Sequence, residues 1–556
     1  MKKALSLLLA IALFSSLACS AYAQQSPSYI ADRTIVGRAF VDDVGSSLPD
    51  NQLESVVARY MKEQTGISFY WEYTSGNNDL EVLTTMLAVG DIPDLILSYC
   101  DNSGRPEFSV LRQAIQAGMF LNLEPYLKNT KVLSKYLDDS WLPLDTAQNV
   151  DRNAEYPDDG IYMLHMRIER YPGARGRDDL ALYMNMDAAQ AAGISPGDIT
   201  DTASLIAAAE TILAKELKDK NGKNVVPIGP SVWGGRMQSE YFLSAAISRG
   251  RETLYGVVDG QVKHISGTEL LAQSVSYMRE ALAKKLIDPE VFSMVSARAQ
   301  EAFINGHYAF MIMNANQANN KYFDTGIEWL PCYNMTDRDG SRALGCPFKS
   351  GYMILAVNAE TENPQEVVDF LDYLCSREGK LAWNYGVEGV HYDLNEEGQP
   401  VMRQEWLDLL ANDASKAMQE GVAALGSDWG YAGNTDMAPY DDFGEYALND
   451  RQNPEKAEHK LYMQNYLEPE VDYYDGVSAA AFFYQLPENV QMKLEQFVDP
   501  KYHADIFVKA CFAESDDAAA KILADYRNLL EKQGIGEMEA LLQKIYEEDP
   551  ASIHFN

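Results

Sequence analysis

The feature that most constrains the fold of this chain is a regular alternation of strand-like and helix-like segments near its start. Residues 34–41 and 67–73 have the composition of strands, and the second segment alternates apolar with more polar side chains. Residues 53–61 place apolar side chains at helical spacing, a second helix is predicted from residue 79, and residues 94–99 form another apolar strand. This order predicts an α/β fold around mostly parallel sheets.

The alternation continues along the 556 residues, a length that predicts two or three domains. Apolar residues make up 46% of the chain and charged residues 23%, which is enough for a globular core. The last 50 residues have a helical pattern. Further strands are expected at 180–184, 225–228, 308–313 and 350–357, and further helices at 204–213, 270–283 and from 364.

The net charge narrows the range of partners. The chain carries 82 acidic residues against 46 Lys and Arg, a formal charge of −36. A surface this acidic repels phosphate backbones and anionic lipids, so we expect neither nucleic-acid binding nor docking to membranes through basic residues.

The N-terminus indicates export. Lys2 and Lys3 precede an apolar run at 4–14 that is too short to span a bilayer, so residues 1–23 are predicted to be a signal peptide. Two processing routes stay open. Cleavage after Ala23 gives an unmodified mature chain, whereas the lipobox-like segment ending at Cys19 gives a lipid-anchored one. The protein is therefore expected in the periplasm or on the extracellular face of the membrane.

Polar and aromatic side chains gather where the predicted strands end. In open α/β sheets ligands bind beyond the carboxyl ends of the strands. Carboxylates and amides can bond hydroxyl groups, and aromatic rings pack on apolar C–H faces, so these positions suit a hydroxyl-rich ligand. The candidate ligand-binding residues at strand ends are Asp42, Asp43, Tyr73, Ser98, Tyr99, Asp101 and Asn314.

No signature of catalysis or of a cofactor is present. The sequence lacks the zinc-protease, serine-hydrolase, Walker and dinucleotide-binding motifs, so we expect a protein that is not an enzyme and has no cofactor or metal. A glycosidase-type carboxylate pair stays open, because 82 acidic residues hide any particular pair. Whether Cys332 and Cys346 form a disulfide also stays open.

Several phrases, taken in order, resemble a known family. The phrase MLAVGDIPD at 86–94 is followed by LYMNMD at 182–187, AFINGHYAFM at 302–311 and GVEGVHY at 386–392, and a helix at 525–534 ends the series. Together they resemble the extracellular solute-binding proteins of ABC importers, family 1, in the long lipoprotein-like branch that serves carbohydrate uptake.

The resemblance implies a two-lobed periplasmic-binding-protein (Venus flytrap) fold with hinge strands and an extended helical C-terminal region. Residues 30–165 plus 300–345 are expected to form the first lobe, and 170–298 plus 350–556 the second. It further implies ligand contacts from Trp233, Lys349 and Tyr352, which lie on a cleft-facing loop and beside the return crossing between the lobes.

The implied function is capture of a carbohydrate, an oligosaccharide in this branch, by a monomer that delivers it to ABC permease subunits. The first alternative is that the same scaffold binds a peptide or another nutrient, or acts as a sensor. A secreted glycan-processing enzyme is the second.

One departure concerns calcium. Some members of the family carry a calcium loop before the strand equivalent to 225–228, but residues 218–225 here read KDKNGKNV and lack the later acidic ligands. A hard divalent cation needs several oxygen donors, so we expect a tight turn at this position. Residues 393–398 are likewise expected to be a hairpin turn.

Overall fold

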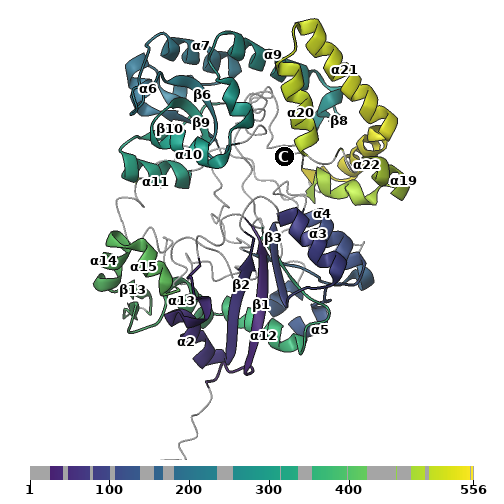
Figure 1. Ribbon diagram of the computed structural model, residues 1–556. Coiled ribbons are helices and arrows are strands. Elements are labelled where there is room, and N and C mark those ends of the chain that lie inside the picture. Colours follow the sequence, from purple (N-terminus) through teal and green to yellow (C-terminus); the bar gives the residue numbers. More distant parts are fainter. Residues whose placement is uncertain are drawn as a thin grey trace, which may run out of the picture.

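The computed structural model divides the chain into two α/β lobes (Figure 1). The first lobe comprises the described parts of 26–166 and 353–421, and the second those of 181–335 and 477–554. The described residues are 26–41, 48–74, 79–99, 107–137, 156–166, 181–234, 254–313, 315–335, 353–396, 398–421, 459, 477–494, 497, 500–550 and 553–554.

The first lobe is built on a five-stranded sheet of order β2-β1-β3-β11-β4. Its strands are β1 (Arg33–Phe40), β2 (Ile67–Tyr73), β3 (Leu95–Tyr99), β4 (Leu164–Met166) and β11 (Met353–Val357). β1 pairs in parallel with both β2 and β3, whereas β11 runs antiparallel between β3 and β4. All residues of β11 are buried, as expected for a strand covered on both faces.

Helices cover both faces of this sheet and create two cores. One core packs β1, β2 and β3 against α2, α12 and α13, and the other packs the opposite face against α3 and α4. The helices and the small hairpin of this lobe are α2 (Val56–Thr65), α3 (Asp79–Val89), α4 (Glu107–Gln116), α5 (Glu124–Leu127), α12 (Pro364–Cys375), α13 (Arg377–Tyr385), β12 (Tyr392–Leu394), β13 (Pro400–Met402), α14 (Gln404–Asn412) and α15 (Ala414–Gln419).

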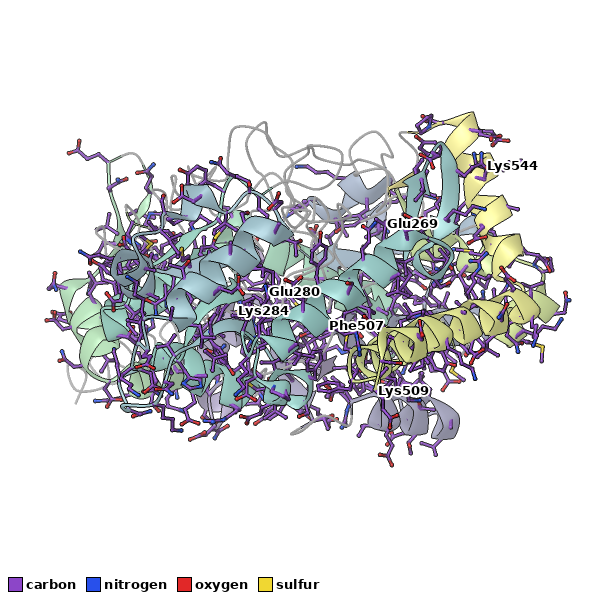
Figure 2. The ribbon with its side chains drawn as sticks, turned by 90° about the horizontal axis from the view of Figure 1, so that it is seen from above. Glu269, Glu280, Lys284, Phe507, Lys509 and Lys544 are labelled. Atoms are coloured by element: carbon purple, nitrogen blue, oxygen red, sulfur yellow. The ribbon has the colours of Figure 1, made fainter. Side chains whose placement is uncertain are left out.

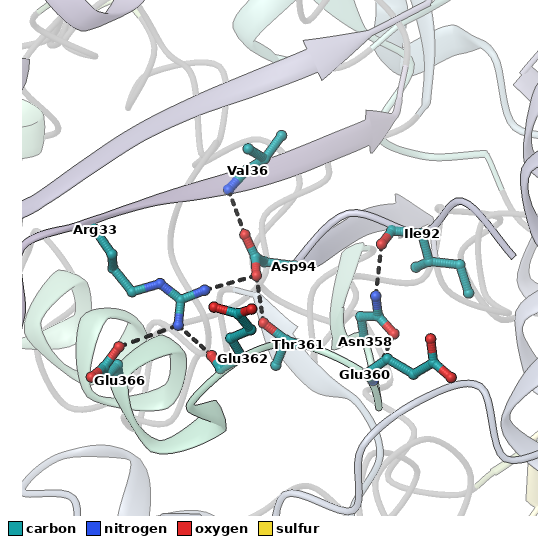
Figure 3. A network of polar contacts seen from close by, with 9 residues as sticks. All are labelled: Arg33, Val36, Ile92, Asp94, Asn358, Glu360, Thr361, Glu362 and Glu366. Carbon is teal, nitrogen blue, oxygen red and sulfur yellow. Dashed lines mark hydrogen bonds and ion pairs between the residues drawn. The ribbon is translucent and has the colours of Figure 1, made fainter.

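Asp94, the last residue of the MLAVGDIPD phrase, connects three segments of the first lobe through hydrogen bonds (Figure 3). Asp94, just before β3, accepts hydrogen bonds from Arg33 Nη2 at 3.0 Å, from the Val36 N–H at 2.9 Å and from the Thr361 hydroxyl. Arg33 also pairs with Glu366 of α12 at 3.3 Å. The network lies at the amino ends of β1 and β3, so this part of the phrase is structural.

The second lobe contains a four-stranded sheet of order β10-β5-β9-β6. Its strands are β5 (Ala181–Asn185), β6 (Val226–Ser231), β9 (Tyr308–Met313) and β10 (Trp329–Pro331). β9 is fully buried and pairs in parallel with β6 and antiparallel with β5. A single continuous core surrounds this sheet and extends into the C-terminal helices.

The remaining elements of the second lobe are helices and a hairpin. They are α6 (Met186–Ala192), α7 (Thr202–Leu213), β7 (Tyr255–Val258), β8 (Gln261–His264), α9 (Glu269–Ala283), α10 (Ser296–Ile304), α11 (Ala315–Thr325), α19 (Glu488–Leu494), α20 (Pro500–Cys511), α21 (Asp516–Gln533) and α22 (Ile535–Glu548). β14 (Val477–Ser478) pairs in parallel with β15 (Ile553–His554). The C-terminal helices confirm the predicted helical extension.

The extension docks beside α9 (Figure 2), where Glu280 and Lys284 lie on α9 and Phe507 on α20. Arg279 of α9 donates from Nη1 to the backbone oxygens of Ala510, Cys511 and Ala513 at 2.7–3.4 Å. These bonds satisfy carbonyls at the end of α20 that the helix itself leaves without partners.

A buried polar cluster joins the hairpin β7–β8 to the extension. The His503 imidazole bonds the Tyr526 hydroxyl through Nδ1 and the Phe497 carbonyl oxygen through Nε2 at 2.6 Å. His264 lies 5.3 Å away, centroid to centroid, and its backbone N–H donates to Glu539 at 2.9 Å. Glu539 is in turn held by Arg527 at 2.7 and 3.1 Å.

The expected assignment of the return segments to the lobes is wrong. Residues 300–335 were assigned to the first lobe, but β9 and β10 lie in the second sheet. Residues 353–421 were assigned to the second lobe, but β11 and α12 belong to the first. An apolar strand that is buried on both faces fits either sheet, so its sequence does not say which one it joins.

Candidate functional site

The carboxyl ends of the parallel strands in both lobes lie where the chain crosses between them. β4 ends at Met166, which pairs with Met353, and Met353 also pairs with Tyr99 at the end of β3. In the second lobe Ala181 pairs with Met313 at the end of β9. The chain therefore leaves one sheet and enters the other at carboxyl edges.

The arrangement in space agrees with this topology. In Figure 1 the strands β1, β2 and β3 run toward the second lobe, and α11, which directly follows β9, lies on the side of the second lobe nearest the first. The two carboxyl edges, defined by the ends of β1–β3 and of β6 and β9, thus face each other. This is where open α/β sheets bind ligands.

Two tyrosines occupy the edge of the first lobe. Phe69, Trp71 and Tyr73 share one face of β2, and Trp71 is 2% exposed whereas Tyr73, the last residue, is 43% exposed. Tyr73 pairs with Ala39, which pairs with Leu97, and Tyr99 lies two residues further on the same face. With a strand spacing of about 4.8 Å, β2 and β3 are roughly 10 Å apart.

Ser98 is placed differently from its neighbour. It is completely buried in β3, beside Phe40 and Ile354, and its hydroxyl makes no hydrogen bond within the described part of the chain. A side chain in this position is closed off from a ligand that arrives from solvent.

Trp233 lies at the edge of the second lobe, two residues beyond the end of β6. It is 38% exposed, whereas the preceding Ser231 and Val232 are completely buried. Its backbone N–H donates to the Ser231 hydroxyl at 3.1 Å. Ser231 gave no sequence signal, because a serine that holds a neighbour's backbone looks like any strand-end serine.

The other candidates lie outside the described residues. They are Asp42, Asp43, Asp101, Asn314, Lys349 and Tyr352. The structure thus places Tyr73 and Tyr99 on one edge and Trp233 on the facing edge, and it leaves the remaining candidates as predictions.

The turn at 218–224 does not offer a calcium site. Asp219 accepts the N–H groups of Asn221 and Lys223 through Oδ1, at 2.8 and 2.9 Å, and bonds His307 Nδ1 through Oδ2 at 2.8 Å. Burial raises the pKa of Asp219, but these hydrogen bonds outweigh it and the net pKa is lowered. Because both carboxylate oxygens are engaged and lysines replace acidic ligands, the donor set does not fit a hard cation.

The predicted turns are confirmed. Gly222 has φ +75°, and its N–H donates to the Asp219 carbonyl at 2.9 Å. Between β12 and β13, the Gly398 N–H donates to the Asn395 carbonyl at 3.0 Å. Within the described residues no group of three or more His, Cys, Asp or Glu is arranged to hold a metal.

An apolar cavity lies beside β2 in the first lobe. Its walls come from α2, β2, α12 and α13, and include Leu48, Gln52, Trp71, Phe370 and Trp383. Gln52 bonds the backbone N–H and carbonyl of Trp71, both at 2.8 Å, and so extends the ladder of edge strand β2. Its lining contains no acid or base, so it offers no general acid–base chemistry.

Cys332 is a buried free thiol, and burial raises its pKa. Cys346, with which a disulfide was left open, lies outside the described residues.

Comparison with known families decides the identity of the chain. The family described as "Bacterial extracellular solute-binding protein" matches residues 45–381. The chain belongs to this family. The resemblance in the sequence phrases is thereby confirmed, and the family's description agrees with the predicted export. No curated protein matches the sequence.

Solved structures share the fold of this solute-binding protein over nearly its whole length. The alginate-binding protein AlgQ2, determined without calcium ion, has a TM-score of 0.63 at 16% identity and covers 94% of this chain and 100% of its own. FusA of S. pneumoniae is an ABC-transporter substrate-binding protein, here an EF-hand mutant with fructo-nystose bound. Its TM-score is 0.64 at 16% sequence identity, and the alignment covers 93% of this chain and 99% of that one.

A third similar structure is an HMO-binding, ABC-transporter-associated protein of Bifidobacterium longum infantis. Its TM-score is 0.61 at 12% identity, and the alignment covers 93% of this chain and 99% of that one. At such identities these proteins establish the fold alone, and they confirm the two-lobed α/β architecture. No helix among the described residues has the length and apolar character needed to cross a bilayer.

Proposed function

We propose that this solute-binding protein captures an oligosaccharide between its lobes and delivers it to the permease of an ABC importer, without catalysis. The observation that carries the proposal is the pair of facing carboxyl edges, with Tyr73 and Tyr99 on one side and Trp233 on the other. Aromatic faces of this kind pack on the C–H faces of sugar rings, while hydroxyl groups find the polar strand ends.

The comparisons support the ligand class. The similar structures named above carry alginate, fructo-oligosaccharide and HMO binding in their descriptions. We extend carbohydrate binding to this chain on the strength of the shared fold and of the aromatic residues at the facing edges.

We further propose that the mature protein is an exported monomer, anchored through Cys19 or released after Ala23. Intact mass spectrometry of the protein from its native membrane separates the two routes. A diacylglyceryl-modified Cys19 establishes the anchor, and an unmodified chain starting at Gln24 establishes plain cleavage.

A thermal-shift screen tests the ligand class. The panel contains kestose, maltotriose, Man5GlcNAc, an HMO mixture and alginate oligosaccharides, with di- and tripeptides as the comparison set. We expect at least one glycan to raise Tm, with the glycan recovered unchanged afterwards. A shift with peptides and with none of the glycans would overturn the carbohydrate assignment, and glycan turnover would overturn the absence of catalysis.

A further inference from the structure

The backbone of the turn that carries Trp233 is fixed by hydrogen bonds and by close packing. At its start, the Trp233 N–H bonds the Ser231 hydroxyl at 3.1 Å and the Gly234 N–H bonds the Ser231 carbonyl at 2.9 Å. Gly234 has φ +75°, and a Cβ at this position would lie 2.6 Å from the Met294 carbonyl oxygen. The backbone on the far side of Trp233 is therefore fitted against residue 294 and admits only glycine.

The peptide groups of Val232 are fixed by two other elements. Its N–H donates to the Ile312 carbonyl of β9 at 2.9 Å. Its carbonyl oxygen accepts from Nε2 of Gln300, on α10, also at 2.9 Å. Val232 itself is completely buried. Of these contacts, the one from Gln300 is made by a side chain that is distant in sequence and can be removed without altering the turn's own residues.

The side chain of Trp233 contrasts with this fixed backbone. It is 38% exposed. A turn with a satisfied backbone that presents an exposed aromatic ring has little conformational freedom to lose when a ligand packs on the ring.

We propose that Gln300 is a positioning residue for ligand binding, which holds the Val232 carbonyl so that the Trp233 ring is oriented before the ligand arrives. The proposal rests on the proposed function, in which Trp233 packs on a sugar. Gln300 acts through Trp233 and makes no ligand contact of its own. Removing its amide frees the turn, and the ligand must then order it, which weakens binding about three- to tenfold.

A double-mutant cycle tests this coupling. The dissociation constants of the wild type, Gln300→Ala, Trp233→Ala and the double variant are measured by calorimetry with the glycan of the thermal-shift panel (kestose, maltotriose, Man5GlcNAc, the HMO mixture or alginate oligosaccharides) that binds the wild type most tightly. We expect Gln300→Ala to weaken binding in the wild-type background and to have no further effect once Trp233 is absent. Gln491→Ala is the matched control, because Gln491 Nε2, on α19, also bonds a backbone carbonyl, that of Leu486 at 2.7 Å.

A ligand-independent readout separates positioning from stability. In protein labelled with 5-fluorotryptophan, the ¹⁹F resonance of Trp233, assigned with Trp233→Phe, should broaden or split in Gln300→Ala and remain sharp in Gln491→Ala. Gln300→Glu, which replaces the donor by an acceptor, should resemble Gln300→Ala.

The outcomes are distinct. An unchanged Trp233 resonance, or an equal loss of affinity from Gln300→Ala in both backgrounds, would overturn the positioning role and leave the proposed function standing. Failure of the wild type to bind any glycan of the screening panel would overturn the proposed function itself, and the ligand-binding role of Gln300 with it.

Discussion

At the scale of single residues, position along a strand decides the role of an aromatic side chain. Trp71 and Tyr73 share one face of β2, yet Trp71 is 2% exposed and Tyr73 43%. The alternation in the sequence predicted this shared face, and the strand end made Tyr73 the better ligand candidate. Ser98 shows the limit of such reasoning, because the burial of a strand-end serine depends on which elements cover the sheet.

Trp233→Ala should weaken glycan binding about tenfold or more, because an aromatic platform at a binding site supplies both buried area and stacking. The measurement is a calorimetric titration with the tightest-binding glycan of the screen. Phe512→Ala is the control, since Phe512 is 49% exposed but sits at the end of α20. Equal effects of the two substitutions would contradict a specific role for Trp233.

The Asp219 turn should be indifferent to calcium. Its carboxylate already bonds two backbone N–H groups and His307, so we expect the same Tm with millimolar calcium and with EDTA. Asp219→Ala should lower the unfolding free energy by about 1–3 kcal/mol, because the N–H groups of Asn221 and Lys223 lose their acceptor. A calcium-dependent rise in Tm that Asp219→Ala abolishes would show that the turn does bind the ion.

At the scale of elements, most helices and strands follow from sequence pattern, but their caps do not. The sequence Asn-Pro-Gln-Glu at 363–366 is typical of a helix start in which the Asn363 side chain caps the helix and Glu366 reaches back to the cap residue. Instead Asn363 has φ +47° and makes no side-chain cap, while Glu366 pairs with Arg33. Glu366 thus pairs with an arginine that is distant in sequence and not with the cap residue, and a local sequence motif contains no information about such a distant partner.

The cluster that joins the C-terminal helices to β8 should make the protein acid-sensitive. Burial lowers the pKa of His503 to about 4, against the upward influence of its bond to Phe497. Burial and the neighbouring His503 and Arg527 likewise lower the pKa of His264. Both imidazoles are therefore neutral in the folded protein.

The direction of the pH effect on stability follows from the number of protons that the folded and unfolded chains bind. Between pH 6.5 and about 4 the unfolded chain binds more protons than the folded one, so stability falls as the pH falls through this window. His503 alone contributes about 3 kcal/mol of this loss. His503→Gln should be less stable at neutral pH but should lose less on acidification, as measured by urea denaturation at pH 7 and pH 5. Identical pH slopes for the two proteins would contradict the assignment.

At the scale of the whole molecule, the sequence predicted two interleaved lobes but assigned each return segment to the wrong lobe. β9 and β11 are both short, apolar and completely buried, so either sheet could accept either strand. The pairing is decided by contacts between residues far apart in the chain. The binding edges could be predicted, because ligands bind at the carboxyl ends of strands in open α/β sheets. The contact of Gln300 with the turn at Trp233 could not be predicted, because it joins residues far apart in the chain.

The corrected topology predicts which fragments fold. Residues 26–180 alone should not fold cooperatively, because β11 is missing from between β3 and β4. Joining 26–166 to 353–421 through a flexible Gly/Ser linker should restore a cooperative thermal transition, monitored by circular dichroism. Joining 26–166 to 300–345 instead is the matched control and should not restore it. Cooperative unfolding of the first fragment by itself would contradict this account.

The position of β11 also has a consequence for the order in which the protein can be assembled. A chain that emerges N-terminus first presents β1, β2 and β3 early, but the sheet of the first lobe is completed only when β11 at 353–357 has emerged. The four-stranded sheet of the second lobe, by contrast, is complete at β10, and β15 pairs only with β14 in a separate two-stranded sheet. Because β11 pairs with β3 and β4, which lie far earlier in the chain, we expect completion of the first lobe to be a slow step, which gives a secretion channel time to thread the chain before that lobe has folded.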